Sequence, residues 1–73
     1  MANEKERALK SIKKLEEFLR ENENFIDEEI KKKAMDYLKD AKYFFDIGDY
    51  FSSFGASDYA YGLIEGNIYC KRK

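Results

Sequence analysis

The stretch that decides the fold lies at residues 43–55 and reads YFFDIGDYFSSFG. Aromatic residues lie on both sides of Gly48-Asp49, and this pair interrupts an apolar rhythm that begins near residue 30. Glycine adopts the left-handed conformation that ends many helices, and an aspartate accepts hydrogen bonds from the first turn of a following helix. A short chain gains more apolar contact by folding back here than by continuing as one helix. We therefore predict a corner between two helices at Gly48, Asp49 and Tyr50.

Residues 26–47, before this corner, are predicted to form one helix. Their apolar residues alternate at spacings of four and three, which places them on a single helix face. These residues are Ile30, Ala34, Tyr37, Ala41 and Phe44, flanked by Leu38 and Phe45. Asn24 or Asp27 is expected to accept hydrogen bonds from the N–H groups of the first turn.

The same helical spacing of apolar residues predicts helices at residues 4–21 and 50–66. The earlier one carries Ala8, Ile12, Leu15 and Leu19 on one face. The later one is expected to end at Gly66-Asn67, and its broad apolar arc comprises Tyr50, Phe54, Ala56, Ala60, Tyr61, Leu63 and Ile64. Three helices with short connections predict an all-α fold, a small antiparallel three-helix bundle forming a single domain over residues 1–73.

Composition and charge narrow the function classes. The chain is 44% hydrophobic and 40% charged, which is typical of a soluble protein rather than a disordered one. Its 14 basic and 15 acidic side chains argue against a dedicated nucleic-acid binder, which usually has a basic excess. The single Cys70 cannot form an internal disulfide, and no membrane-spanning stretch or signal peptide is visible. We therefore expect a cytoplasmic protein, with residues 71–73 as a disordered basic tail.

The residues that usually carry catalysis are missing. The chain has no His, no activated Cys and no glycine-rich phosphate-binding loop, so we expect no enzymatic activity and no cofactor. Asp36 and Asp40 lie four residues apart and, with Asp58, are weak candidates for a divalent metal site. The alternative is that these carboxylates are simply solvated.

Most of the aromatic residues are core candidates by their spacing: Tyr37, Phe44, Phe45, Phe54 and Tyr61. Phe51 and Tyr59 lie opposite the main apolar arc of the third helix, together with Gly55 and Gly62. Aromatic residues are enriched at the centres of protein interfaces, and a strip without side chains lets another backbone approach. We predict that Phe51, Gly55, Tyr59 and Gly62 form an interface; the alternative is that Phe51 and Tyr59 are scattered surface aromatics.

Three segments carry a resemblance to a known family: Asp40-Ala41-Lys42-Tyr43-Phe44, Gly48-Asp49-Tyr50 and the run YAYGLIE at 59–65. In order and spacing, residues 34–66 resemble the short archaeal proteins of the domain-of-unknown-function family 357. The resemblance implies a small helical protein of the archaeal cytoplasm. Tyr61 stands where that family usually has a His.

The corner is also similar to nucleotide-binding helical bundles of the HEPN class, some of which are ribonucleases. Those enzymes use an Arg and a His, and the absence of His excludes that activity here. The sequence thus predicts a protein-interaction or homo-oligomerisation module, acting as a homodimer or with another protein. The alternative is a HEPN-like, non-catalytic nucleotide or RNA binder using Lys31–Lys33 and Lys71–Lys73.

Overall fold

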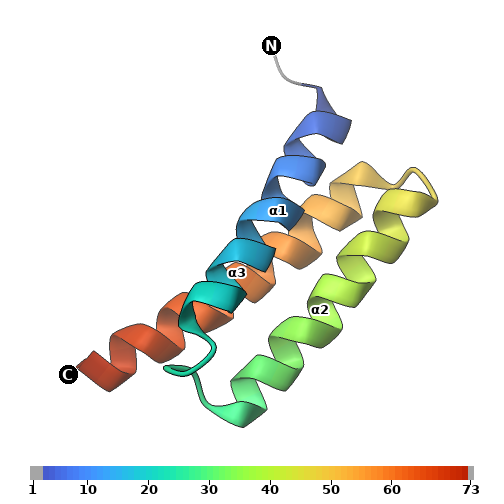
Figure 1. Ribbon diagram of the computed structural model, residues 1–73. Helices are drawn as coiled ribbons and strands as arrows, with labels where there is room; N and C mark the ends of the chain where they lie inside the picture. The colour runs from blue at the N-terminus through green and yellow to red at the C-terminus, as the bar shows by residue number, and fades with distance from the viewer. Residues whose placement is uncertain (1–2, 73) are drawn as a thin grey trace.

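The computed structural model describes residues 3–72, which form three helices and no strand. They are α1 (Glu4–Asn22), α2 (Glu28–Asp46) and α3 (Tyr50–Arg72). The chain runs along α1, returns along α2 and runs back along α3, so the ends of the chain lie at opposite ends of the bundle (Figure 1). Both other helices pack mainly against α3. The predicted antiparallel three-helix bundle is confirmed.

The corner between α2 and α3 is formed by Gly48 and Asp49, as predicted. Gly48 has φ +84°, the one positive φ among the described residues. The Asp49 N–H donates to the Phe44 carbonyl oxygen at 2.8 Å, which closes the last turn of α2. The Asp49 carboxylate then accepts from the Ser52 N–H at 3.1 Å and caps α3. Hydrogen bonds from Ser52 also hold the pKa of Asp49 below its ordinary value.

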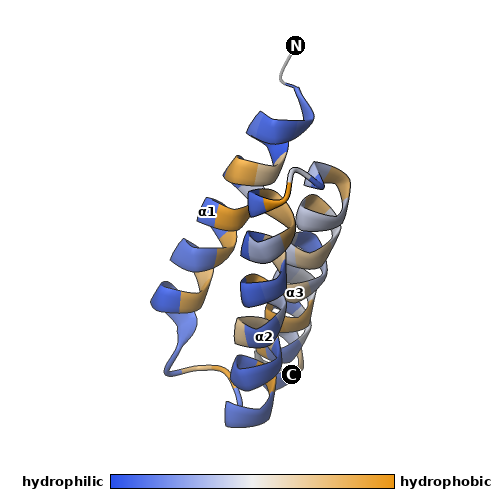
Figure 2. Cartoon of the chain, turned by 90° about the vertical axis from the view of Figure 1, so that its right-hand side faces the viewer, coloured by the Kyte–Doolittle hydropathy of each residue, from blue (hydrophilic) through white to orange (hydrophobic). Residues whose placement is uncertain are grey.

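Helix α1 buries the four residues that the sequence placed on its inner face. Ala8, Ile12, Leu15 and Leu19 are all buried. Figure 2 shows hydrophilic residues on the outer side of α1 and hydrophobic ones toward the other helices. Asn3 caps the helix by accepting from the Glu6 N–H at 2.8 Å.

Helix α2 begins at Glu28, two residues after the predicted start at 26. Ile26 is excluded from the helix because its side chain, 5% exposed, packs into the core from the preceding loop. Asp27 occupies the cap position, but its side chain makes no capping hydrogen bond, contrary to expectation. The carboxylate instead accepts from the Asn67 amide at 3.0 Å and pairs with Lys71 at 2.8 Å.

Helix α3 is longer than predicted: it continues through Gly66 and Asn67 to Arg72. Gly66 lies within the helix without a positive φ, and Ile68 packs against the core one turn beyond Ile64. Asn67 is hydrogen-bonded to Asp27, and Lys71 forms an ion pair with it. These contacts hold the last turns of α3 against the start of α2. Lys71 and Arg72 of the expected tail therefore belong to the helix, while Lys73 lies outside the described residues.

The centre of the bundle consists mainly of small side chains. Fully buried positions include Ala8, Ala34, Ala41, Ala60, Ser53 and Ser57, with Leu15 and Ile64 as the largest. The Ser53 hydroxyl donates to the Ala41 carbonyl oxygen at 2.7 Å, which joins α3 to α2. The Ser11 and Ser57 hydroxyls lie 2.7 Å apart and join α1 to α3.

The aromatic core candidates are only half-buried, so the prediction that they fill the core is wrong in degree. The small residues draw the three backbones together and leave the rings at the edges of the contacts between helices. Tyr61 stacks on Phe18 of α1 with ring centroids 4.2 Å apart. Phe45 meets Tyr50 edge to face at 5.3 Å across the corner.

Candidate functional site

The outer face of α3 carries the four residues predicted to form an interface. The Phe51 side chain is 82% exposed and that of Tyr59 is 55% exposed. Gly55 lies between these two rings and Gly62 follows Tyr59 on the same face, and both glycines are exposed. A Cβ atom added at either glycine would meet no heavy atom within 4 Å. The structure thus brings these residues together on one open surface of α3.

Because α3 is longer than expected, this surface continues past Gly62. Gly66 and Tyr69 follow at spacings of four and three, and the Tyr69 side chain is 62% exposed. We call the six residues Phe51, Gly55, Tyr59, Gly62, Gly66 and Tyr69 the α3 strip. Gly62, Gly66 and Tyr69 also border a shallow hollow. The sequence reasoning missed Gly66 and Tyr69 because it ended the helix too early.

Tyr59 is held in place from α2. Its ring meets the Tyr37 ring edge to face, with centroids 4.8 Å apart and an interplanar angle of 70°. Such a contact fixes the ring while more than half of the side chain stays exposed. Tyr59 therefore presents a defined aromatic surface rather than a freely rotating one.

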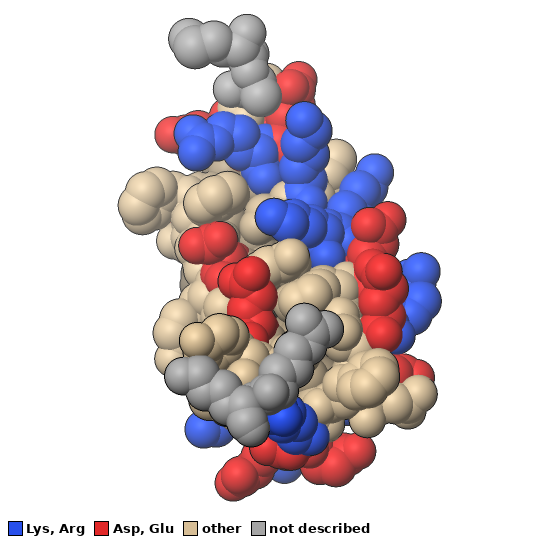
Figure 3. Space-filling model, turned by 90° about the vertical axis from the view of Figure 1, so that its left-hand side faces the viewer, with Lys and Arg blue, Asp and Glu red and all other residues tan. Residues whose placement is uncertain are grey.

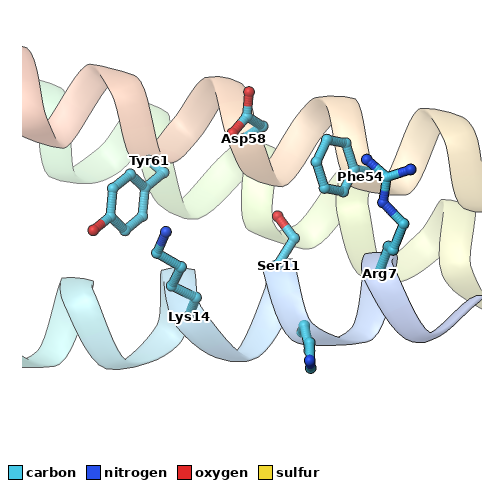
Figure 4. A pocket seen from close by; sticks show the side chains of 7 residues that line it. Arg7, Ser11, Lys14, Phe54, Asp58 and Tyr61 are labelled. Atoms are coloured by element: carbon cyan, nitrogen blue, oxygen red, sulfur yellow. The ribbon is translucent and has the colours of Figure 1, made fainter. Parts of the chain in front are cut away.

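A second feature, which we call the α1–α3 groove, lies on the opposite flank of α3 from Tyr37. It is a hollow of about 250 Å³ bordered by Arg7, Ser11, Lys14, Phe54, Asp58 and Tyr61. In Figure 4 Arg7 lies beside Phe54 at one end, Lys14 points toward Tyr61 at the other, and Ser11 lies between them. The Arg7 guanidinium carbon is 5.3 Å from the Phe54 ring centroid, and the Lys14 ammonium is 4.6 Å from that of Tyr61.

The charge around this groove is mostly basic. Arg7, Lys10 and Lys14 border it against the single carboxylate of Asp58. Figure 3 shows basic side chains gathered near the N-terminal end of the molecule, with acidic ones beside and below them. The sequence reasoning missed this site because its residues on α1 and those on α3 are at least forty positions apart in the chain. Within α1 alone they resemble any solvated charged face.

The three candidate metal ligands are not brought together. Asp36 and Asp40 are exposed on α2, whereas Asp58 faces the α1–α3 groove. Residues 3–72 contain no group of three or more His, Cys, Asp or Glu side chains arranged to hold a metal ion. The two aspartates of α2 are thus left without a third protein ligand.

The basic segments proposed for RNA binding lie at one end of the bundle, but acidic residues accompany them. Lys31–Lys33 follow Glu28 and Glu29 in the first turns of α2. Lys71 is engaged by Asp27 at 2.8 Å. In the described part of the chain, acidic residues thus interrupt these basic segments, unlike the continuous basic groove that tracks a phosphate backbone.

Comparison with known proteins gives a family. The family model described as "Protein of unknown function (DUF357)" matches residues 2–71, nearly the whole chain and more than the 34–66 that carried the resemblance. No curated protein and no solved structure matches the chain. Among the described residues, no helix is both long enough and apolar enough to cross a membrane.

Proposed function

The chain belongs to the DUF357 family, and on that premise we propose that it is a non-enzymatic module of the cytoplasm that binds protein through the α3 strip. Its first partner is a second copy of the same chain, which makes the protein a homodimer. The observation that carries the proposal is the strip itself: exposed rings at Phe51 and Tyr59, interleaved with glycines that have open space above them.

The distribution of residues around α3 supports this proposal. Its inner face is small and buried, with Ser53, Ser57 and Ala60, and its outer face carries rings and glycines instead of a row of charges. A helix without a marked polar face is usually buried on more than one side. In the monomer α3 is covered by α1 and α2 only, so the outer face is left for a partner.

A second copy suits this surface because the strip alternates large and small residues. When two copies of α3 pair in antiparallel orientation, Phe51 and Gly66 of one chain can lie opposite Gly66 and Phe51 of the other, and Gly55 opposite Gly62. Such a two-fold contact needs the same patch on both subunits. Burying an aromatic side chain of this kind contributes about 1.5–3 kcal/mol. A 73-residue chain with a small core gains much from that addition.

Size-exclusion chromatography with light scattering over a range of concentrations tests the proposal. We expect a concentration-dependent dimer, which Phe51→Ala weakens. Phe25→Ala is the matched control, because Phe25 is 65% exposed but lies in the loop between α1 and α2 and not on α3. A monomer at high micromolar concentration, unaffected by Phe51→Ala, would refute self-association.

Gly55→Leu is a second test of self-association, and this substitution should not destabilise the folded monomer. The added side chain enters open space in the monomer. It also replaces glycine, whose helix propensity is lower than that of every residue except proline. It would nevertheless hold a second backbone away from the strip. We expect Gly55→Leu to melt no lower than the wild type under dilute conditions and to dimerise less. A variant that dimerises as the wild type does would contradict the close approach of two α3 helices.

A further inference from the structure

The α1–α3 groove has a chemistry that the α3 strip lacks. Arg7 and Lys14 lie two turns apart on α1, and each rests on an aromatic ring of α3. Among the residues whose side chains the structure describes, the ion pairs are Lys42–Glu16 and Lys71–Asp27, so neither Arg7 nor Lys14 is neutralised by a carboxylate within 4 Å. Both side chains are exposed. They are therefore two available cations at the rim of one hollow.

We propose that this groove binds a small phosphate monoester of a hydroxylated compound, such as a sugar phosphate or a nucleoside phosphate. The phosphate lies on Arg7 and Lys14. A charge-assisted hydrogen bond to phosphate is about twice as strong as a neutral one, and the planar guanidinium of Arg7 matches two phosphate oxygens at once. Long, exposed side chains can turn from the rings to the ligand with little disturbance of the bundle.

The polar groups between Arg7 and Lys14 are hydrogen-bond acceptors, so the ligand must carry hydrogen-bond donors. The Ser11 and Ser57 hydroxyls share a hydrogen bond at 2.7 Å, and the Ser11 oxygen keeps a lone pair that can accept from a ligand. Asp58, which borders the same hollow, accepts through its carboxylate. The negatively charged phosphate group is repelled by Asp58, so it must lie on the cations and leave its neighbouring hydroxyl groups to face that carboxylate. A phosphate ester with neighbouring hydroxyl groups satisfies both the cations and the acceptors.

The size of the groove favours a single small ligand over a polymer. Its volume of about 250 Å³ is close to the lower end, roughly 300 Å³, for small-molecule sites. Phe54 and Tyr61 supply apolar ring surface at its two ends. Once Arg7 and Lys14 turn to the phosphate, this surface is free for the carbon skeleton of the ligand. An extended nucleic acid would need more basic surface than this chain of net charge −1 provides.

Titration of the ¹⁵N-labelled full chain, followed by NMR at about 50 mM salt where phosphate contacts are strong, tests this proposal. The probes are ribose 5-phosphate, adenosine monophosphate, inorganic phosphate and ribose. We expect at least one ester to shift the amides of Ser11 and Asp58, and to bind more tightly than inorganic phosphate or ribose. Tighter binding of the nucleotide would identify a nucleoside phosphate as the ligand, and equal or weaker binding would identify a sugar phosphate.

Two variants and a control complete the experiment. Arg7→Gln and Lys14→Gln should each weaken ester binding by about tenfold, since each removes a charge-assisted contact. Lys32→Gln, an exposed lysine of α2, should leave binding unchanged. All three side chains are exposed, so the variants should keep the helical circular dichroism of the wild type. The proposal is overturned if neither ester shifts the groove amides, if inorganic phosphate or ribose binds as tightly, or if Arg7→Gln and Lys14→Gln have no effect.

Discussion

The same substitution, glycine to alanine, should have opposite effects at Gly48 and Gly55. Gly55 lies inside α3 on an exposed face, and a Cβ atom there would meet no heavy atom within 4 Å. Alanine is favoured over glycine inside a helix by about 0.8–1 kcal/mol. Gly48 also has open space around it, but its φ is +84°. An L-residue in that conformation costs roughly 1–2 kcal/mol. Gly55→Ala should therefore stabilise the monomer, and Gly48→Ala should destabilise it.

Thermal unfolding at a low, monomeric concentration measures both effects. For a domain of this size, 1 kcal/mol corresponds to about 4–8 °C in Tm, so a difference of about 2–3 kcal/mol should separate the two variants by roughly 7–24 °C. Because neither added methyl group touches a neighbour, packing cannot account for the difference. Equal shifts in the same direction would refute the assignment of Gly48 as the left-handed helix end. A lower Tm for Gly55→Ala would refute its placement on an open helix face.

Three further changes test the core and its connections. Leu15→Ala should cost about 2–5 kcal/mol, read by urea unfolding, because the Leu15 side chain is completely buried; a loss below 1 kcal/mol would contradict that burial. Ser53→Leu should cost about 1–3 kcal/mol or prevent folding by overpacking the contact between α3 and α2, whereas a neutral effect would show that the contact is loose. Hydrogen bonds from Lys71 and then Asn67 hold the pKa of Asp27 below its ordinary value. The stability from this contact is complete above the ordinary carboxyl pKa and is lost as pH falls through the lowered one, so Lys71→Ala should flatten the acid side of a Tm-against-pH curve. An unchanged curve would contradict the contact.

The parts of the fold that depend on local chemistry were predictable from the sequence. The inner face of α1 follows from a four-three-four spacing of aliphatic residues, and the corner follows from a glycine beside a capping aspartate. The end of α3 was not predictable in this way. Gly66-Asn67 has the composition of a helix end, but Asn67 finds its partner on Asp27, 40 residues earlier in the chain. Tertiary contacts of this kind override local propensity.

The composition of the core was missed for a related reason. Ser53 and Ser57 are absent from the predicted apolar arc of the third helix, yet both are fully buried. A hydroxyl that donates to a helix carbonyl is no longer an unpaired polar group, and a serine occupies little more space than an alanine. Ser53, Ser57, Ala60 and Ile64 in fact share a four-three-four spacing, so the signal was present. Reading small residues along with large ones at helical spacing would have found the inner face of α3.

The small core also explains why the candidate surfaces are aromatic. Where three backbones approach closely over alanine and serine, large rings cannot fit between them and must lie at the edges or outside. At the edge between α1 and α3 the rings of Phe54 and Tyr61 receive the cations of α1, which produces the groove. On the outside of α3 no helix of the bundle covers Phe51, while Tyr59 meets Tyr37 of α2 at one edge and stays more than half exposed. An aromatic residue at position 51 adds little to the stability of the monomer, because the Phe51 side chain is 82% exposed, so its value to the protein must come from something it contacts. Replacing Phe51 should therefore change assembly more than folding, and that difference separates an interface from a surface that is apolar by chance.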